Sequence, residues 1–203
     1  MAKLILIVFA SVFSALFNPP ANEVFKVDVN RSKIEWVGKK ITGSHTGELK
    51  LSSGEFQVNA GKIVSGDFTI AMNSMQVTDL RGADATRLLG HLKSEDFFST
   101  EDFPIAKFTI TNIKQQEAEK VSVTGDLTIK GITNSINFLA SIKQRNAVLV
   151  AVANHVKVDR TKYAIKYGSK NFITGLGDKA IDDFFELNIS IVAKNLNHPV
   201  NNP

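Results

Sequence analysis

The chain has 203 residues, of which 43% are hydrophobic and 22% charged, a composition typical of one globular domain and not of a disordered segment. The formal net charge of +4 is modest, and the basic residues are spread along the chain, which argues against a nucleic-acid partner. There is no cysteine, so disulfides, thiolate metal sites and thiol nucleophiles are excluded.

The N-terminus, residues 1–21, is predicted to be a secretory signal peptide. Lys3 precedes an uncharged apolar run of 14 residues, and the run ends at Asn18-Pro19-Pro20. This run is shorter than the ~20 residues that a membrane-spanning helix needs, although an uncleaved anchor is the alternative. Ala15 and Ala21 are the candidate cleavage sites. The prediction places the protein in the periplasm or outside the cell.

From Phe25 onward the dominant hydrophobic period is two, which is typical of strands with one apolar and one polar face. Turn signals separate the strands, among them Ser52-Ser53-Gly54, Asn59-Ala60-Gly61, Lys130-Gly131 and Asn134-Ser135. At least eight strands with short connections predict an all-β, antiparallel meander. Because one face is apolar throughout, the sheet must close into a barrel or pack as a sandwich.

The pentad Gly-Asp-[Phe/Leu]-Thr-Ile occurs twice, at residues 66–70 and 125–129. Its acids could be read as a site beside a glycine turn. Alternation instead places Asp67 and Asp126 on the polar face and turns Phe68 and Leu127 inward. The pentad is therefore interpreted as two strands of one wall.

Two segments interrupt the strand pattern. Residues 79–98 predict a short helical insert, with Asp84 capping a helix over 85–92 and Ser94 capping a second turn. Such an insert often covers an open end of a barrel. The Gly- and Lys-rich stretch 163–183 predicts a loop at the barrel mouth. The remaining chain divides into a barrel domain, residues 22–194, and a polar tail, residues 195–203.

No motif in the sequence indicates catalysis or metal binding. The four histidines, His45, His91, His155 and His198, have no metal-ligand spacing, and His155 is expected on the rim or outer face. No nucleophile elbow or phosphate-binding loop occurs. We therefore predict no catalytic residue, no metal and no cofactor other than a possible bound lipid.

The inward-facing apolar residues are the stronger signal. The interior of an eight-stranded barrel is either filled by side chains or able to hold one small ligand, and the sequence leaves both possibilities open. The candidate apolar wall comprises Trp36, Phe68, Ile70, Met72, Phe108, Ile110, Leu127, Ile129, Phe138, Leu187 and Ile189. In the mouth loop, Lys166, Lys170 and Lys179 could hold an anionic headgroup, and we take Lys166 and Lys170 as candidates; a solvated basic loop is the alternative.

The order of several phrases resembles the YceI-like family of secreted bacterial lipocalin-like proteins, which are also described as polyisoprenoid-binding. The resemblance runs from about Phe25 to Ala193. It rests on WVGKKITGSHTGELKLSSGEF, GDFTIAMNSM, GHLKSEDFFSTEDFPIAKFTITNI, VTGDLTIKGITNSINF and VDRTKYAIKYGS. It implies an eight-stranded antiparallel lipocalin-like barrel, export to the periplasm and an apolar cavity for an isoprenoid or fatty-acyl chain. It supplies no catalytic residue.

Three functions are weighed. The first is binding, transport or storage of a long-chain isoprenoid or similar amphiphilic lipid, with only transient membrane contact and a possible homodimer. The second is a structural or stress-response barrel that is fully packed and acts through its outer surface. The third is a lipid-modifying enzyme, which would require His45 or His91 to face the cavity beside a carboxylate.

Overall fold

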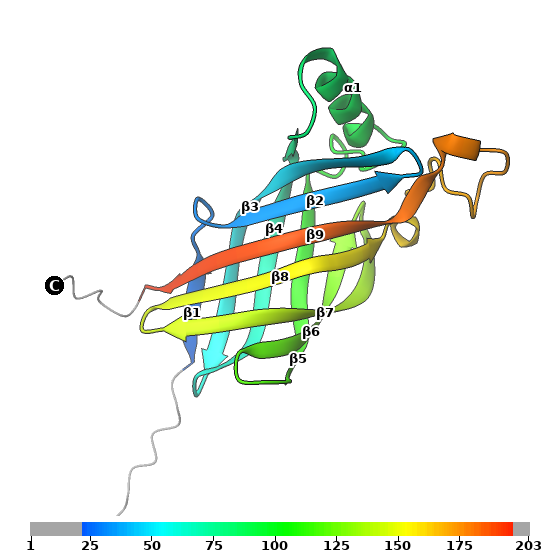
Figure 1. Cartoon of the computed structure of the whole chain (residues 1–203). Helices are drawn as coiled ribbons and strands as arrows, with labels where there is room; N and C mark the ends of the chain where they lie inside the picture. Colours follow the sequence, from blue (N-terminus) through cyan, green and yellow to red (C-terminus); the bar gives the residue numbers. More distant parts are fainter. Residues whose placement is uncertain (1–21, 197–203) are drawn as a thin grey trace, which may run out of the picture.

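A computed structural model describes residues 22–196, so the predicted signal peptide and residues 197–203 of the predicted tail lie outside the described part (Figure 1). Within residues 22–196 there are nine strands, one α-helix and two short 3-10 helices. The strands are β1 Glu23–Val27, β2 Lys33–Lys40, β3 Gly43–Asn59, β4 Lys62–Val77, β5 Ile105–Gln115, β6 Lys120–Ile129, β7 Ile132–Arg145, β8 Val148–Asp159 and β9 Ile181–Asn195. The helices are α1 Gly82–Lys93, η1 Arg160–Tyr163 and η2 Gly177–Lys179.

The sheet closes on itself through eight strand positions. Strands β2 to β9 pair antiparallel around the ring, and pairing of β3 with β4 closes it. β1 and β2 both lie between β3 and β9: Phe25 pairs with Phe56 and Asn195, whereas Trp36 pairs with Gly47 and Leu187. The two strands thus form one interrupted position, and the predicted eight-stranded antiparallel lipocalin-like barrel is confirmed.

Two of the predicted turns are hairpin turns of one type. Ala60-Gly61 and Lys130-Gly131 have the same φ angles, 50° and 73°, which are those of a two-residue type I′ connection. The turns predicted at 52–54 and 134–135 are wrong, because both segments lie inside strands. Residues 52–54 instead accompany a register shift in the long strand β3, and small residues favour such a bend.

The repeated pentads flank β5 on its two sides. Phe68 of β4 pairs with Phe108, and Phe108 pairs in turn with Leu127 of β6. Thr109 lies between Asp67 and Asp126, and its hydroxyl donates a 2.8 Å hydrogen bond to Asp67 Oδ1. The interpretation of the pentads as wall is therefore correct, and their acids lie on the outer face.

The helical insert lies at one end of the barrel (Figure 1). The predicted cap is wrong: α1 begins at Gly82 and Asp84 lies in its first turn, where a carboxylate favours the helix dipole. Leu89, Leu92 and Phe98 pack against the barrel core and fix the insert there. No helix among residues 22–196 combines the length and apolar character needed to cross a bilayer.

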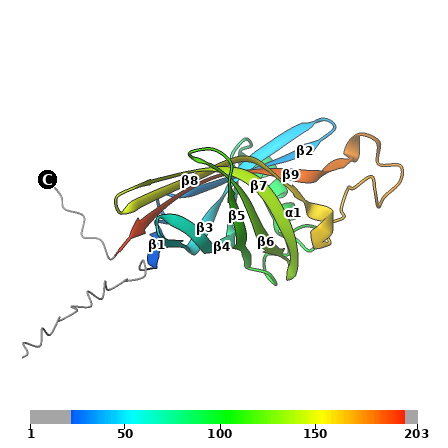
Figure 2. The same ribbon diagram turned by 90° about the horizontal axis from the view of Figure 1, so that it is seen from below.

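The two ends of the barrel differ in packing. Phe25, Val58, Leu149 and Ala193 are fully buried at the end where β1 begins and β9 finishes, and they fill that end. The opposite end, here called the mouth, carries α1 and the loop between η1 and β9 (Figures 1 and 2). Any open interior must therefore be reached from the mouth.

Gly125, the glycine of the second pentad, gives a test of the wall. A Cβ at this position would lie 2.4 Å from Phe108 Cζ and 2.6 Å from the Thr109 carbonyl oxygen. We expect Gly125→Ala to lower the free energy of unfolding by about 2–3 kcal/mol in urea titrations, because the backbone atom cannot move aside. The control is Gly90→Ala in α1, where no atom lies within 4 Å of the added carbon. Gly90→Ala should be neutral or stabilising by up to ~1 kcal/mol, and equal effects of the two changes would contradict the account.

Candidate functional site

An apolar cavity of about 550 Å³ occupies the barrel between its packed end and the mouth. Strands β2 to β9 all contribute side chains to its wall, and α1 contributes Leu88 and Leu92 from above. The barrel is therefore hollow over part of its length, which the sequence could not decide.

All eleven residues of the predicted apolar wall line this cavity. Alternation along each strand places them there, since residues two apart share a face. They are mostly buried, with Met72 at 4% and Ile129 at 5% exposure. Their role as ligand contacts stays a prediction.

Four phenylalanines form a continuous row along one side of the cavity. The ring centroids are 5.0 Å apart for Phe56 and Phe68, 6.4 Å for Phe68 and Phe108, and 5.7 Å for Phe108 and Phe138. The Phe108 ring extends from β5 across β6 toward Phe138 on β7. It can do so because Gly125 of β6 has no side chain in the space that the ring occupies. The glycine of the pentad thus shapes the wall directly.

The mouth of the cavity is polar, in contrast to its interior. Its polar lining residues are Lys39, Lys40, His45, His91, Arg160, Tyr167, Asp178, Lys179 and Asp182. Lys166 and Lys170 are not among them, whereas Lys179 of the same loop is. Lys166 Nζ instead lies 4.6 Å from the centroid of the Phe172 ring. The predicted headgroup role of Lys166 and Lys170 stays a prediction.

Two histidines at the mouth lie beside carboxylates. His45 Nδ1 is 2.8 Å from Asp79 Oδ2, and the Thr46 amide donates to Asp79 Oδ1 at 3.0 Å. Burial raises the pKa of Asp79, but the hydrogen bonds from Thr46 and His45 outweigh it and lower that pKa below its ordinary value. These contacts tie the β2–β3 hairpin to the segment that leads into α1.

His91 lies on α1 and packs edge-on against two aromatic rings. Its centroid is 4.9 Å from that of Phe97 and 4.5 Å from that of Tyr167. Its Nε2 is 3.5 Å from Asp96 Oδ2. The cluster joins the insert to the loop between η1 and β9.

His155 lies on the outer face, as the sequence predicts, with its side chain 77% exposed. It occupies a bulge in β8 with φ 54°, and its Nδ1 is 3.0 Å from Glu186 Oε2. Glu186 also accepts a 2.6 Å hydrogen bond from Lys39 Nζ. The bonds from Lys39 and then His155 lower the pKa of Glu186 to about 2, so this carboxylate stays charged and ties β2, β9 and β8 together.

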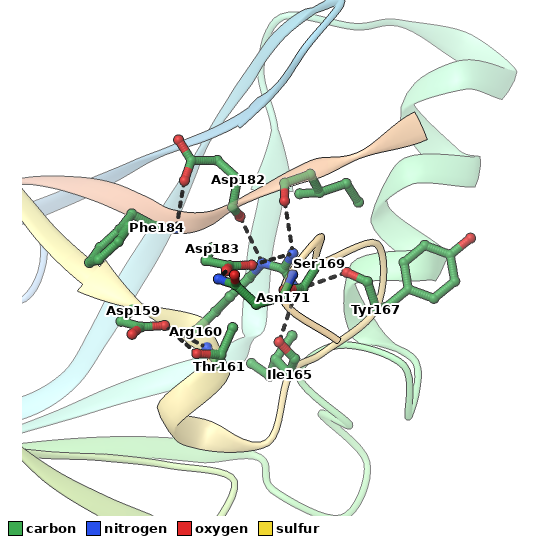
Figure 3. Close-up of polar contacts among 11 residues, drawn as sticks. Asp159, Arg160, Thr161, Ile165, Tyr167, Ser169, Asn171, Asp182, Asp183 and Phe184 are labelled. Atoms are coloured by element: carbon green, nitrogen blue, oxygen red, sulfur yellow. Dashed lines mark hydrogen bonds and ion pairs between the residues drawn. The ribbon is translucent and has the colours of Figure 1, made fainter. Parts of the chain in front are cut away.

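Arg160 is the residue at the mouth that the sequence analysis missed. Its side chain is 4% exposed and donates to four backbone carbonyls (Figure 3). Nε bonds to Asp182 at 2.8 Å, Nη1 to Ile165 at 2.9 Å and Tyr167 at 2.8 Å, and Nη2 to Ile181 at 3.2 Å. The guanidinium therefore joins the start of the mouth loop to the start of β9.

The charge of Arg160 is balanced from nearby. Asp183 Oδ1 lies 3.6 Å from its Nη2, and the Phe97 ring centroid lies 5.9 Å from its Cζ. Burial lowers the pKa of the guanidinium against the opposing carboxylates of Asp183, Asp182 and Asp159, but an arginine stays protonated in a protein. A sequence signal did exist, because Arg160 continues the inward alternation of Val156 and Val158.

A protein-family model matches most of the described residues. The YceI-like domain model matches residues 25–193. The chain belongs to the YceI-like family. This confirms the resemblance seen in the sequence, and the match covers β2 to β8 and all but the last two residues of β9.

Similar sequences are named for the same family. A UPF0312 protein of Photorhabdus laumondii is 54% identical over 46 residues, which is 23% of each chain. A UPF0312 protein of Shewanella denitrificans is 31% identical over 94 residues, 46% of this chain and 47% of its own. Protein YceI of Escherichia coli O157:H7 is 29% identical over 96 residues, 47% of this chain and 48% of its own. The chain thus spans about half or less of the length of these curated relatives.

Solved structures share the fold. BcnA of Burkholderia cenocepacia superposes with a TM-score of 0.68 and 22% identity, over 83% of this chain and 99% of its own. A polyisoprenoid binding domain from Saccharophagus degradans gives a TM-score of 0.61 and 14% identity, over 84% of this chain and 98% of its own. At these identities the likeness concerns the fold alone.

Arg160 gives the test of how the mouth is held. We expect Arg160→Gln and Arg160→Lys both to lower the free energy of unfolding by about 3 kcal/mol, since each leaves buried carbonyls without donors. Hydrogen exchange should rise in residues 164–181 and not in the packed end of the barrel. Arg145→Gln is the control, because Arg145 is exposed and has no ion pair within the described residues. Unchanged exchange in both Arg160 variants would show that other contacts hold the loop.

Proposed function

We propose that this protein binds a long-chain isoprenoid or a similar amphiphilic lipid in its barrel cavity and carries or stores it in the periplasm. The observation that carries the proposal is a hollow, apolar interior of about 550 Å³ that is closed at one end and polar at the other. An amphiphile with one long apolar chain and one polar end matches that distribution of side chains.

The size of the cavity suits such a chain. Small-molecule sites typically have volumes of ~300–1,000 Å³. An apolar cavity of ~150 Å³ takes up benzene, with its six carbons, so by proportion 550 Å³ accommodates about 20 carbons. This is enough for a chain of three or four isoprene units.

The orientation of the ligand follows from the two ends. The fully buried residues Phe25, Val58 and Leu149 close the far end, so the chain enters tail first and its headgroup stays at the mouth. Lys40 and Lys179 line the mouth together with Asp178 and Asp182, whereas the charge of Lys39 is paired with Glu186. These charged groups favour a polar headgroup.

The proposed mechanism is passive transfer. Each Å² of apolar surface moved from water into the cavity contributes on the order of 25 cal/mol, reduced by the cost of ordering the chain. The polyisoprenoid binding domain from Saccharophagus degradans, which shares the fold, supports an isoprenoid ligand. The apolar leader predicted at residues 1–21 supports export.

The proposal predicts that protein isolated from its own host retains lipid. Native mass spectrometry under gentle conditions should show the mass of the protein plus a bound lipid. Extraction with organic solvent should remove that added mass, and the extracted lipid can then be identified. A clean unliganded mass under those conditions would count against the carrier function.

Two substitutions on one strand separate cavity binding from other effects. Ala140→Trp places an indole inside the cavity, whereas Leu139→Trp adds it to the outer face, where Leu139 is 65% exposed. We expect Ala140→Trp to weaken binding of a fluorescent polyene fatty acid at least tenfold, roughly 1.4 kcal/mol, and Leu139→Trp to leave it unchanged. Equal binding by both variants would place the ligand outside the barrel.

The alternatives fare differently. The structural alternative assumed a fully packed barrel, and the cavity contradicts that assumption. The lipid-modifying enzyme is a second candidate, because His45 and His91 both line the mouth beside carboxylates. A carboxylate that orients an imidazole is the arrangement of a general base, which could activate water.

Turnover assays test whether the protein is a lipid-modifying enzyme. Protein incubated with an isoprenoid diphosphate or a long-chain ester should release no phosphate or acid above the buffer rate if the proposal of passive binding is right. Release that His45→Gln or His91→Gln abolishes, with unchanged binding of the fluorescent fatty acid, would instead establish the enzyme.

A further inference from the structure

The segment between η1 and β9, residues 164–180, exposes apolar side chains at the mouth. We call it the mouth loop. Tyr167, Phe172 and Ile173 are 45%, 51% and 41% exposed. In two perpendicular views the loop extends further from the barrel than any other connection at this end (Figures 1 and 2). Single exposed apolar side chains are normal on a protein surface. A group of them in one projecting segment indicates a site of contact with a partner or a membrane.

The mouth loop also carries unpaired positive charge. Lys166, Lys170 and Lys179 form no ion pair within residues 22–196, and only Asp178 of the same loop is an acid. Of the two acids that follow the loop, Asp183 lies by Arg160 and accepts a hydrogen bond from Asn171, and Asp182 accepts one from the Phe184 amide at 3.0 Å (Figure 3). The loop therefore presents three cations against one anion.

Cations and exposed apolar side chains lie close together on this surface. Lys166 Nζ lies 4.6 Å from the centroid of the exposed Phe172 ring. The Ile41 amide donates to the Ala180 carbonyl at 3.4 Å, which joins the β2–β3 hairpin to the loop, and Ile41 is 55% exposed. The hairpin adds Lys40, which also lines the cavity.

The surface is continuous with the cavity opening. Tyr167 and Lys179 belong both to the mouth loop and to the cavity lining. Arg160 fixes the base of the loop through the carbonyls of Ile165 and Tyr167. A partner that covers this surface would therefore cover the entrance to the cavity as well.

We propose that the mouth loop and the β2–β3 hairpin form a docking surface for a lipid bilayer with anionic headgroups. Phe172 and Ile173 enter the interface between headgroups and acyl chains, and Lys166, Lys170 and Lys179 lie at the level of the phosphates. The inference rests on the proposed lipid carriage for its purpose, since docking sets the cavity mouth against the source of the lipid. The docking itself is testable without a cavity ligand.

A bilayer fits this surface better than a second copy of the chain. Four of the 17 residues of the mouth loop are buried, so the loop offers 13 residues and the hairpin tip at 40–43 adds four, fewer than the ~20–30 residues a side of a stable protein interface. Like charges on the loop would also face each other across a two-fold axis. Basic residues around apolar ones suit a partner that is anionic at its surface and apolar beneath.

The first test is flotation with vesicles of neutral phosphatidylcholine, with and without phosphatidylglycerol. The wild-type protein should float with the anionic vesicles, and Phe172→Ser with Ile173→Ser should reduce the partition coefficient at least tenfold. The matched control is Val64→Ser with Leu139→Ser, which removes two exposed apolar side chains from β4 and β7. All variants share the same N-terminal residues, so any contribution of those residues cancels in the comparison. Equal partitioning of the loop variant, the control and the wild type would overturn the proposal.

The second test concerns charge. Replacing Lys166, Lys170 and Lys179 by Gln should reduce partitioning into anionic vesicles by about fivefold per lysine, or on the order of 100-fold together, at low salt. Added salt should weaken the vesicle binding of the wild-type protein far more than that of the triple variant, because salt screens the attraction between the lysines and the phosphates. A triple variant that partitions like the wild type would contradict the proposed phosphate contacts.

The outcomes for docking and for carriage are distinguishable. The Phe172→Ser with Ile173→Ser variant should still bind the fluorescent polyene fatty acid, because neither residue lines the cavity, and this binding reports on the cavity and on correct folding. Loss of vesicle binding with retained cavity binding supports docking. If the protein binds vesicles but its cavity binds no lipid, the docking proposal stands and the proposed lipid carriage is wrong. Sedimentation that shows a wild-type dimer and monomeric Phe172→Ser with Ile173→Ser would assign the surface to a second copy and overturn the proposal.

Discussion

A sheet that closes on itself turns every second side chain of eight strand positions toward one shared axis, and the rest of this structure follows from that constraint. Whether the axis is filled depends on the side chains that meet there. At one end Phe25, Val58, Leu149 and Ala193 meet and leave no exposed area. Further along, Ala106, Ala140 and Ala153 alternate with larger residues, and the phenylalanine row lies along the wall. The same closure therefore produces a packed base and a hollow middle.

In a closed barrel the backbone N–H and C=O groups of the strands pair with neighbouring strands. At the mouth, the connecting segments need other hydrogen-bond partners. The mouth loop leaves β8 and returns to β9, and its carbonyls have no ladder partners there. Arg160 supplies donors to two of them, at Ile165 and Tyr167, and to the carbonyls of Ile181 and Asp182 at the start of β9, which a flexible ammonium could not do in the same geometry. The cost of burying this cation is offset by Asp183 and by the aromatic face of Phe97. A charged residue thus holds the rim of an otherwise apolar cavity.

The sequence predicts the wall of this cavity better than its rim, for a physical reason. Period two along a strand decides which face a side chain occupies, so Phe68, Leu127 and Leu187 could be placed without coordinates. The rim joins segments far apart in the chain, such as His45 with Asp79 and Arg160 with Asp182, and no local pattern encodes those contacts. The turn predicted at 52–54 failed because small residues also serve to bend a long strand, and the cap predicted at Asp84 failed because helix ends are the least certain part of a pattern. Whether the barrel is hollow depends on volumes summed across eight strands, which alternation does not report.

The position of the polar and apolar groups at the mouth links the two proposals physically. A lipid that leaves a bilayer through water exposes its whole chain, at a cost of on the order of 25 cal/mol for each Å². That exposure falls if the cavity entrance lies against the bilayer while the chain moves. Tyr167 and Lys179 contribute to both surfaces, so an orientation that inserts Phe172 and Ile173 also brings the entrance to the headgroups. The packed base faces away from the membrane in this orientation, and because Phe25, Val58 and Leu149 fill it, the lipid would enter and leave by the same rim.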